Sequence, residues 1–434
     1  MKIKKAFSII AFVWLSSMLL VACSDGEDEG NASGDSKTVK FMHLWPEGSS
    51  AQHYKVVNQI IEDFEAENEG IEIEVEVLSN EQYKEKIKVQ STSNELPDVG
   101  MTWAAGYMEP FVDGGMFASL EDILEEDNLA GNFVTGTTEA FSIDDTAYGL
   151  PLELNISSIY YNKAIFDEYG LKEPTTLEEF NQVVDTLKEN GINPVALGNR
   201  DAWTGSMWYM YLANRLGGEE DVLTNAIDRS GSFEDPALLQ AAEELQALVN
   251  NDSFVSGFNG LADQEAKSMF MESQAAMYLI ATWDLPNYTT NEDVPQEFRD
   301  SVGYFPFPQV DGNGDFNSYV GGPGVGLFVS ENSEVKDEAK AFVSYFVKEW
   351  GERAVTEVGI IPATKIDGEV LDLPDLYVEV LNDLNNASNI TLYADVQMSA
   401  SAAQVHLDMI QALFGGEITP EEFVKTHEET LAKE

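Results

Sequence analysis

The segment IEIEVEVL, at residues 71–78, alternates strictly between aliphatic and acidic residues. That period of two is typical of a β-strand with one buried face. Upstream, KTVKFMH at residues 37–43 has the composition of a first strand, and apolar residues recur at helical spacing over residues 54–67. Downstream, a second helix is expected over residues 83–92, and LPDVGMTW at residues 96–103 returns to a strand. This strand–helix–strand–helix–strand order predicts a parallel sheet with helices on both faces.

The same alternation continues through the rest of the chain. Further strands are expected at residues 157–161, 275–282 and 324–330. Further helices are expected at residues 177–187, 236–249 and 335–350, with a last one after residue 419. Thr176 and Thr419 each precede a glutamate by three residues, which is the spacing of a capping box. Because roughly 400 residues exceed the usual size of one hydrophobic core, the α/β chain is expected to form two lobes.

The N-terminus has the pattern of an export signal. Three lysines precede an apolar run over residues 6–20, which is too short to span a membrane comfortably. The run leads into LVAC, which resembles the processing box of bacterial lipoproteins, whose cysteine becomes an acylated N-terminus. We therefore expect a signal peptide at residues 1–22, then a lipidated Cys23 and a disordered acidic linker at residues 23–37. The alternative is an ordinary signal peptide with an incidental cysteine.

The chain is strongly acidic. It has 77 Asp and Glu against 24 Lys and Arg, a formal charge of −53. Nucleic acids and anionic surfaces would be repelled, so neither is an expected partner. The acids are dispersed along the chain, which favours solubility in a salty or alkaline habitat. The alternative is a cationic ligand, such as a polyamine, which would require carboxylates gathered in a cleft.

Catalytic and metal-binding motifs are missing from the sequence. The four histidines, His43, His53, His406 and His427, show no metal-ligand spacing, and no nucleophile-elbow or phosphate-loop motif occurs. DGNGD at residues 311–315 resembles a calcium loop only in part, because Phe316 stands where a glycine is required. We therefore expect no enzyme activity, no metal and no cofactor. A glycoside hydrolase with two catalytic carboxylates remains the alternative, since 77 acids give no basis for choosing a pair.

Tryptophans give the clearest signal for a binding site. Trp45, Trp103 and Trp283 each follow the end of an expected strand. In an open α/β sheet, ligands bind in the crevice outside the carboxyl ends of the strands. An indole face suits a sugar, because the C–H groups on one face of a pyranose are apolar and weakly positive.

Polar neighbours extend this candidate set. Glu47, Asp98 and Asp284 lie close in sequence to the three tryptophans. Trp203 lies in the loop GNRDAWTG, together with Arg200 and Asp201. Hydroxyl groups of a sugar would take hydrogen bonds from such side chains. Two other tryptophans, Trp208 and Trp350, are expected in the core.

GLPLELNISSIYYNKAIFDEYGLKEPTTLEEF, at residues 149–180, is similar to the signature of extracellular solute-binding proteins of bacterial sugar ABC transporters. Other motifs of that family follow in order, among them QAAM before Trp283, FPFP at residues 305–308 and IPA at residues 361–363. The resemblance implies a two-lobed, periplasmic-binding-protein-like fold of the maltose-binder type, with a mostly parallel sheet in each lobe and a hinge between them.

Domain boundaries follow from this resemblance. It implies chain crossings near residues 151–155, 306–308 and 350. The N-terminal lobe would comprise residues 38–152 plus 307–349. The C-terminal lobe would comprise residues 153–306 plus 350–434.

The resemblance also implies roles for individual residues. Trp283 matches the tryptophan that stacks on sugar, and Asp98 and Glu153 match positions whose side chains often reach the cleft. Asn155, at the first expected crossing, and Gly322, in the glycine-rich turn GGPGVG at residues 321–326, complete the candidate ligand-binding set. In the segment 397–402, which resembles a cleft segment of maltose binders, an aromatic residue is missing near Ala402, which disfavours maltodextrin as the ligand.

Together these features predict a monomeric receptor on the extracellular face of the cell membrane, anchored through Cys23. It would capture a carbohydrate by lobe closure, with an oligosaccharide as the expected ligand, and deliver it to the permease subunits of an ABC importer. The surface-anchored hydrolase and the binder of a cationic ligand remain the alternatives.

Overall fold

The computed structural model describes residues 36–218, 221–366 and 373–433. The predicted signal peptide at residues 1–22, Cys23 and the linker up to residue 35 lie outside the described residues. Within the described ranges, no helix combines the length and the apolar character needed to cross a membrane.

The first lobe is built on a five-stranded sheet. Its strands, in order across the sheet, are β2 (Ile71–Val77), β1 (Lys37–His43), β3 (Val99–Thr102), β12 (Gly326–Val329) and β6 (Leu150–Pro151). β1 and β2 are parallel, in register from Lys37 with Ile71 to His43 with Val77. In β2 the three glutamates are exposed whereas Ile73 is buried, which confirms the one-sided strand expected from the alternation.

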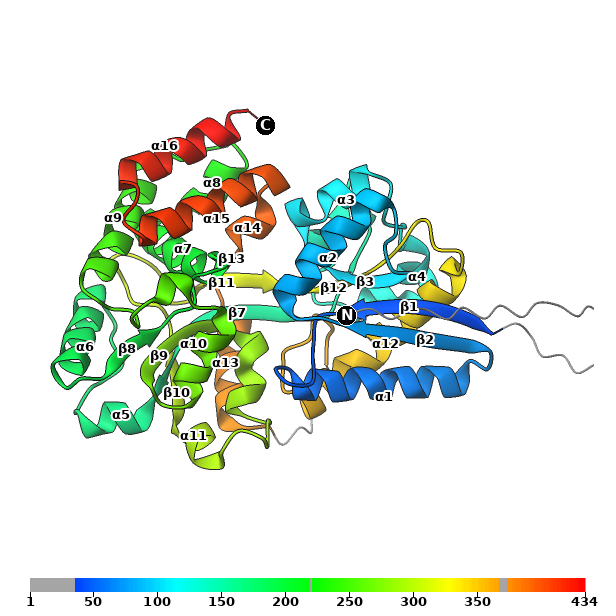
Figure 1. Cartoon of the computed structure of the whole chain (residues 1–434), viewed down its shortest axis with the longest axis horizontal. Coiled ribbons are helices and arrows are strands. Elements are labelled where there is room, and N and C mark those ends of the chain that lie inside the picture. Colours follow the sequence, from blue (N-terminus) through cyan, green and yellow to red (C-terminus); the bar gives the residue numbers. More distant parts are fainter. Residues whose placement is uncertain (1–35, 219–220, 367–372, 434) are drawn as a thin grey trace, which may run out of the picture. The chain divides into compact units, whose positions relative to one another are not determined.

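Helices cover both faces of this sheet. They are α1 (Ala51–Glu67), α2 (Asn80–Ser93), α3 (Glu109–Asp113), α4 (Glu121–Glu125) and α12 (Lys336–Arg353). Figure 1 shows α1 and α12 below the sheet and α2 above it. The buried face of α1 carries the apolar residues expected from its period, and Tyr83 of α2 donates its hydroxyl to the Met101 carbonyl of β3 at 2.7 Å. The helices are therefore fixed to the strands by apolar packing and by hydrogen bonds.

The second lobe contains a six-stranded sheet. Its strands are β13 (Asn389–Leu392), β11 (Ser318–Pro323), β7 (Leu154–Asn162), β9 (Ala275–Ala281) and β8 (Asn193–Ala196), with β10 (Val302–Phe305) also paired to β7. A small hairpin of β4 (Ser142–Ile143) and β5 (Thr146–Ala147) belongs to neither sheet. The helices after β7 are α5 (Lys163–Glu168), α6 (Leu177–Glu189), α7 (Trp203–Gly217), α8 (Val222–Ile227), α9 (Pro236–Asn250), α10 (Asp263–Met271), α11 (Gln296–Ser301), α13 (Asp375–Asn385), α14 (Ala394–Gln397), α15 (Ala400–Phe414) and α16 (Pro420–Leu431).

The predicted capping residues hold helix starts in place. The Thr176 hydroxyl accepts the Glu179 N–H at the start of α6, and the Thr419 hydroxyl accepts the Glu422 N–H at the start of α16. Each bond satisfies an N–H that would otherwise lack a partner within the helix.

The α/β class with helix-flanked sheets is confirmed, but the strand pairing is mixed rather than mostly parallel. β3 and β12 are antiparallel in the first sheet, and β7 is antiparallel to β9, β10 and β11 in the second. The physical reason is connectivity. Parallel neighbours arise from strand–helix–strand units, whereas β7 and β12 enter their sheets directly from the other lobe.

Three segments connect the sheets and meet at one place. The first runs from β6 into β7 through Glu153, and the second runs from β11 into β12 (Figure 1). The third passes through residues 361–363. Leu154 N–H donates to the Ile361 carbonyl at 2.9 Å, and Gly324 N–H donates to the Glu153 carbonyl at 3.0 Å. The backbone around Glu153 therefore ties all three crossings together.

Two crossings lie later in the chain than expected. The prolines at residues 306 and 308 end β10 without a change of sheet, since β11 still pairs with β7. Residues 307–323 therefore do not join the first sheet. The chain also stays on the first lobe beyond Trp350, because Ala363 N–H donates to the Leu152 carbonyl at 3.2 Å and Val134 N–H donates to the Ala363 carbonyl at 2.8 Å.

Candidate ligand-binding cleft

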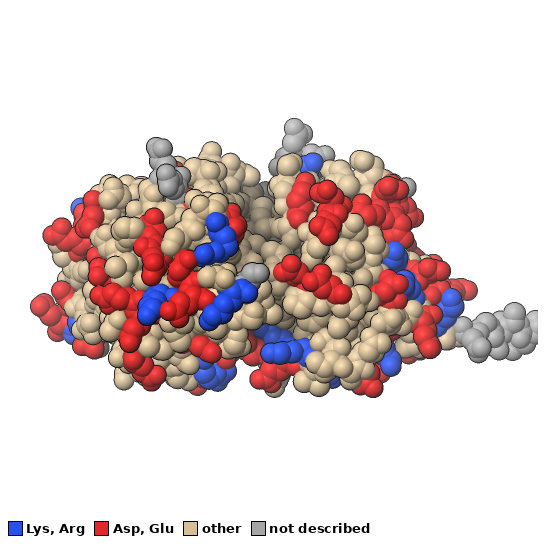
Figure 2. Space-filling view, turned by 90° about the horizontal axis from the view of Figure 1, so that it is seen from above, with Lys and Arg blue, Asp and Glu red and all other residues tan. Residues whose placement is uncertain are grey.

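A cleft of about 330 Å³ lies between the two sheets. Trp45 follows β1, Trp103 follows β3 and Trp283 follows β9, and all three line the cleft, as expected from the strand ends. Figure 2 shows a recess between the two halves of the molecule, with red acidic side chains spread over both halves. The acids therefore cover the surface and are not gathered at the cleft alone.

Three aromatic rings form a cluster on the second lobe. The centroid of the Trp283 ring lies 6.0 Å from that of Trp203, with the planes at 63°, and 5.8 Å from that of Tyr393, at 54°. Trp283 and Trp203 are half-buried, and Trp203 is the first residue of α7. Indole surface is thus left open to the cleft on a rigid support.

The two neighbours of Trp283 fix its backbone. The Thr282 hydroxyl donates to Oδ1 of Asn155 at 2.8 Å. On the other side, Oδ1 of Asp284 lies 2.5 Å from Nζ of Lys267, and Oδ2 accepts the Tyr288 hydroxyl at 2.6 Å. Asp284 is fully buried, and both of its oxygens have partners within the protein. It therefore holds Trp283 in position and has no oxygen left over for a ligand.

Lys267 also faces a second carboxyl, that of Asp263. Burial raises the pKa of Asp263 to about 6, although Lys267 and the hydroxyl of Tyr278 both favour the charged form. Burial disfavours the charge on Lys267 as well, but Asp284 and Asp263 together raise its pKa, so this lysine stays charged. The wall thus contains a buried cation held by two acids.

The first lobe contributes Trp103, which is half-buried. The Tyr107 ring packs edge-on against it, with centroids 4.9 Å apart, and Nζ of Lys84 lies 4.9 Å above its ring. Lys84 extends from α2 and pairs with Glu81 at 3.6 Å. A cation over an indole face is a favourable contact that holds the ring in place.

Trp45 is more enclosed than the other cleft tryptophans. Its ring stacks on Trp350, with centroids 5.0 Å apart and planes at 7°, and only 5% of its surface is exposed. The small exposed part of Trp45 lines the cleft. Trp350 and Trp208 lie in the core, as expected.

Glu153 lies at the crossings and is buried. Its Oε1 accepts the Val325 N–H at 3.4 Å, whereas Oε2 has no hydrogen-bond partner among the described residues. Burial raises the pKa of Glu153 to about 7. One oxygen of this cleft carboxyl is therefore buried without a protein partner.

Seven of the candidate residues line the cleft. They are Trp45, Trp103, Glu153, Arg200, Trp203, Trp283 and Asp284. Arg200 lies at the rim, where it pairs with Asp201 at 3.3 Å.

Four candidates lie elsewhere. Asp98 precedes β3, at the end opposite Trp103, where it accepts the Lys40 N–H at 2.8 Å and the Ser333 hydroxyl at 2.6 Å. Glu47 is exposed in a turn, although residues on both sides of it line the cleft. The side chain of Asn155 is engaged by Thr282 behind the wall. Gly322 pairs with Asn155 within β11, and its neighbour Gly324 lines the cleft instead.

Several residues of the cleft escaped the sequence analysis. They include His53, Lys84, Tyr107, Asp263, Lys267, Tyr393 and Asp395. Asp263 and Lys267 are separated by four positions at the start of a helix, so their pairing could have been noticed. Tyr393 carried no local signal, because it reaches the cleft from a segment more than 100 residues after Trp283 in the sequence.

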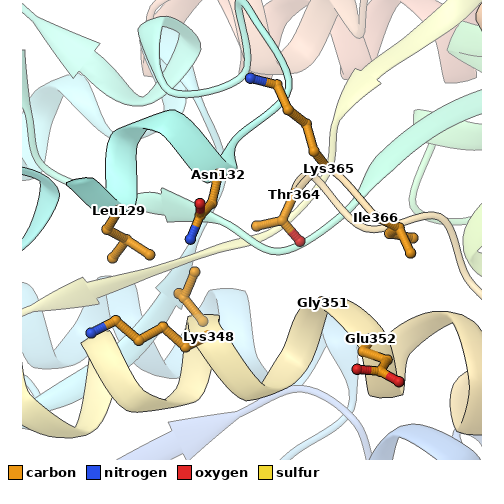
Figure 3. Close-up of a pocket in the computed structure, with 9 residues that line it drawn as sticks. Leu129, Asn132, Lys348, Gly351, Glu352, Thr364, Lys365 and Ile366 are labelled. Carbon is orange, nitrogen blue, oxygen red and sulfur yellow. The ribbon is translucent and has the colours of Figure 1, made fainter. Parts of the chain in front are cut away.

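Another cavity, of about 400 Å³, lies within the first lobe between α12, residues 129–132 and residues 364–366. Figure 3 shows Lys348 and Glu352 on the helix, with Thr364 and Lys365 on the facing segment. Among the described residues that line this cavity, none is aromatic. Among the described residues, no group of three or more His, Cys, Asp or Glu side chains is placed to hold a metal ion. The cleft is therefore the candidate site.

Comparison with known proteins gives a consistent picture. The family model described as bacterial extracellular solute-binding protein matches residues 47–349. The multiple sugar-binding protein of Streptococcus mutans is 25% identical over 355 residues, which cover 80% of this chain and 79% of that protein. The melibiose/raffinose/stachyose-binding protein of Bacillus subtilis is 22% identical over 406 residues, 91% of this chain and 87% of that protein.

Solved structures agree. A structure from work on xylan utilization by Caldanaerobius polysaccharolyticus has a TM-score of 0.85 and 32% identity, covering 90% of this chain and 99% of that one. A chitin oligosaccharide binding protein has a TM-score of 0.82 and 24% identity, covering 92% and 99%, which shows a shared fold.

Proposed function

The chain belongs to the family of bacterial extracellular solute-binding proteins, and we propose that it captures a neutral oligosaccharide in the cleft and delivers it to the permease of an ABC importer. The sugar-binding relatives and the match to a structure from work on xylan utilization support a carbohydrate as ligand. The relatives are named as binding proteins, which supports capture without bond cleavage.

One observation carries the proposal. Half-buried indoles from both lobes line the same cleft, with Trp103 on one side and the Trp203–Trp283 pair on the other. A sugar ring that stacks on either side would place its C–H face on an indole and its hydroxyls toward the polar walls. The two lobes could thus grip one chain of sugar rings.

The charges of the cleft support a neutral ligand. Each of the three lining cations pairs with a carboxylate, namely Lys84 with Glu81, Arg200 with Asp201 and Lys267 with Asp284. An anionic sugar would therefore find no unpaired cation in this wall. Of the remaining carboxyls, Asp263 also faces Lys267, and burial raises the pKa values of Glu153 and Asp395, which makes these acids poor anchors for a polyamine.

Lobe closure supplies the mechanism. Three extended crossings join the lobes, and a small change of backbone dihedrals there would rotate one lobe against the other. A ligand favours the closed state only through contacts that the open state lacks. Stacking on Trp103 and Trp283 at once would supply such contacts. The lobe boundaries of this proposal fall in the crossings at residues 151–154, 323–326 and 361–366.

The anchor is part of the proposal. The lipoprotein-like box ending in Cys23 supports attachment to the extracellular face of the membrane, where an acidic linker would let the receptor reach its permease. We propose that the receptor acts as a monomer.

A thermal-shift screen tests the function. The panel contains xylo-oligosaccharides, chito-oligosaccharides, raffinose, stachyose and the polyamine spermidine. A ligand at 100 times its Kd should add about 2.7 kcal/mol to the free energy of unfolding and raise Tm by several degrees. A neutral sugar that raises Tm without being hydrolysed supports the proposal. A shift with spermidine alone, or hydrolysis products, would contradict it.

A further inference from the structure

Glu153 occupies a place in the fold where ligand and hinge meet. Its own backbone forms the first crossing, its carbonyl accepts the N–H of Gly324 in the second, and it is bridged to Pro362 in the third. Its side chain lines the cleft. Any group that binds this carboxyl therefore contacts the segments that must bend when the lobes close.

The carboxyl fits tightly, yet one of its oxygens has no partner. Glu153 is 4% exposed, and Oε2 makes no hydrogen bond with any described residue. Gly324 leaves room for it, since a Cβ there would lie 2.3 Å from Oε1 of Glu153 and 2.5 Å from Nδ2 of Asn155. Nδ2 of Asn155 is likewise buried without a partner. A polar atom that is buried without a partner costs free energy, so a ligand group that reached Oε2 would supply the missing bond.

The surroundings of Glu153 provide no counter-charge. None of the ion pairs of the described residues includes it. Tyr393, which feels the charge of Glu153, has a pKa raised far above neutrality by its burial and stays uncharged. Asp284 lies on the 3-10 helix η5 (Thr282–Tyr288). Its negative charge is compensated by the ion pair with Lys267. The segments at residues 323–325 and 361–363 carry no ionisable side chain.

The pKa of Glu153 agrees with this geometry. Burial raises it to about 7, against the opposing effects of the Val325 N–H and the Asn155 amide. A substantial fraction of the molecules therefore carries a neutral acid here at neutral pH.

We propose that Glu153 binds the sugar as a neutral carboxylic acid that donates its Oε2 hydrogen to a hydroxyl or ring oxygen of the ligand. This inference rests on the proposed function and specifies the chemistry of one of its residues. In the charged form the same carboxyl would be a buried anion without a counter-charge, which is unfavourable. Binding is therefore linked to the proton, and raising the pH weakens it.

The expected dependence is steep. When only the protonated form binds, the apparent Kd rises about tenfold for each pH unit above the pKa of the free protein, or about 100-fold between pH 6 and pH 9. Burial also raises the pKa of Asp395 in the wall, but the charge of Lys84 opposes that effect. Two further ionisable groups of the wall differ in kind. Asp263 is compensated by Lys267 and bonded to Tyr278, and burial lowers the pKa of His53 to about 3, so that it stays neutral.

Calorimetric titration with xylotetraose at pH 6, 7, 8 and 9 tests the inference. Wild type should lose about 100-fold in affinity across this range. Glu153→Gln keeps an N–H donor and a carbonyl acceptor of the same shape without a titrating proton, so its Kd should change less than about threefold. Glu244→Gln is the matched control, because burial raises the pKa of this carboxyl too but it does not line the cleft, and it should keep the wild-type affinity and slope. A wild-type Kd that is constant or falls with pH would overturn the inference.

Ligand-free melts separate this inference from the proposed function. If the buried carboxyl is neutral, Tm of wild type relative to Glu153→Gln should fall as pH rises from 5 to 7 and then level off, because in that window the unfolded state ionises and the folded state does not. A constant difference would overturn the neutral acid itself. If the melts show that Glu153 titrates while no sugar of the panel binds at any pH, that result would contradict the proposed function, and the proposed hydrogen bond from Glu153 to a sugar would be wrong as well.

Discussion

Lys267 and Asp284 form a buried ion pair, with Nζ 2.5 Å from Oδ1, at the residue that follows Trp283. Asp284 also accepts hydrogen bonds from Asn287 at 2.8 Å and from Tyr288 at 2.6 Å. The indole is therefore supported by a charged and fully bonded cluster.

Asp284→Ala should destabilise the protein by about 3–5 kcal/mol, because it leaves the buried ammonium of Lys267 with only Asp263 as a partner. Sugar affinity should fall too, since Trp283 loses its anchor. Chemical denaturation and calorimetry measure the two effects. Glu429→Ala breaks the exposed Lys425–Glu429 pair at 3.7 Å and should cost less than about 1 kcal/mol. Equal losses in both variants would show that the buried pair has no special role.

Trp283→Ala should abolish the ligand-induced rise in Tm while leaving the ligand-free protein folded. The ring is half-buried and lines the cleft, so its main expected contacts are with the ligand and not with the hydrophobic core. Trp208→Ala should do the reverse. That ring is 1% exposed and packs against Phe180, Phe254 and Phe307, so its loss should cost about 3–5 kcal/mol of stability. Normal affinity in the Trp283 variant would mean that the stacking platform lies elsewhere.

Gly324→Ala should destabilise the crossing and weaken sugar binding, because a Cβ would lie 2.3 Å from Oε1 of Glu153. A cost of about 1–3 kcal/mol is expected for such overpacking. Gly260→Ala is the control, since its Cβ would meet no atom within 4 Å. Thermal melts of both variants measure the loss of stability. An unchanged Tm in Gly324→Ala would show that the crossing accommodates the added methyl group without cost.

Acid should destabilise the protein through its buried histidines. His427 Nδ1 donates to the Phe423 carbonyl at 2.8 Å, so its Nε2 must accept from Nδ1 of His406 at 2.9 Å, and Nε2 of His406 then accepts the Ser206 hydroxyl at 2.7 Å. In the neutral form of both histidines, every ring nitrogen therefore has a hydrogen-bond partner. Burial accordingly lowers the pKa of His427 to about 4, and it lowers the pKa of His406 well below its usual value.

Because these pKa values lie below the unfolded value of about 6.5, the contribution of each histidine is present above that pH and is lost as pH falls toward the folded pKa. For His427 the loss amounts to about 3 kcal/mol. His427→Gln, whose amide oxygen can accept from His406, should reduce the slope of stability against pH between 6.5 and 4.5 by about one proton. Urea unfolding at four pH values measures this, and an unchanged slope would show that His427 is not the titrating group.

Local elements were largely predictable from the sequence. The strand at residues 37–43 has the predicted bounds, and Thr176 caps its helix as its spacing indicated. These features depend on neighbours a few positions apart, where period and capping chemistry are visible in one segment.

The cleft was predictable only where it follows strand ends. Trp103 and Trp283 line the cleft, as their place after strand ends indicated, whereas Asp98 precedes β3 and lies at the far end of that strand. Tyr393 comes from a distant segment without a local pattern. The crossings were misplaced for a related reason, since a proline shows where a strand stops but not which sheet the chain enters next.

The position of β12 in the first sheet has a consequence for biogenesis. This strand joins β3 to β6, so that sheet stays divided into two pieces until residues 326–329 have been synthesised. An emerging polypeptide therefore remains without a finished first sheet for about three quarters of its translation. Late completion of this kind suits a secretory chain that must pass through a narrow translocation channel before it folds.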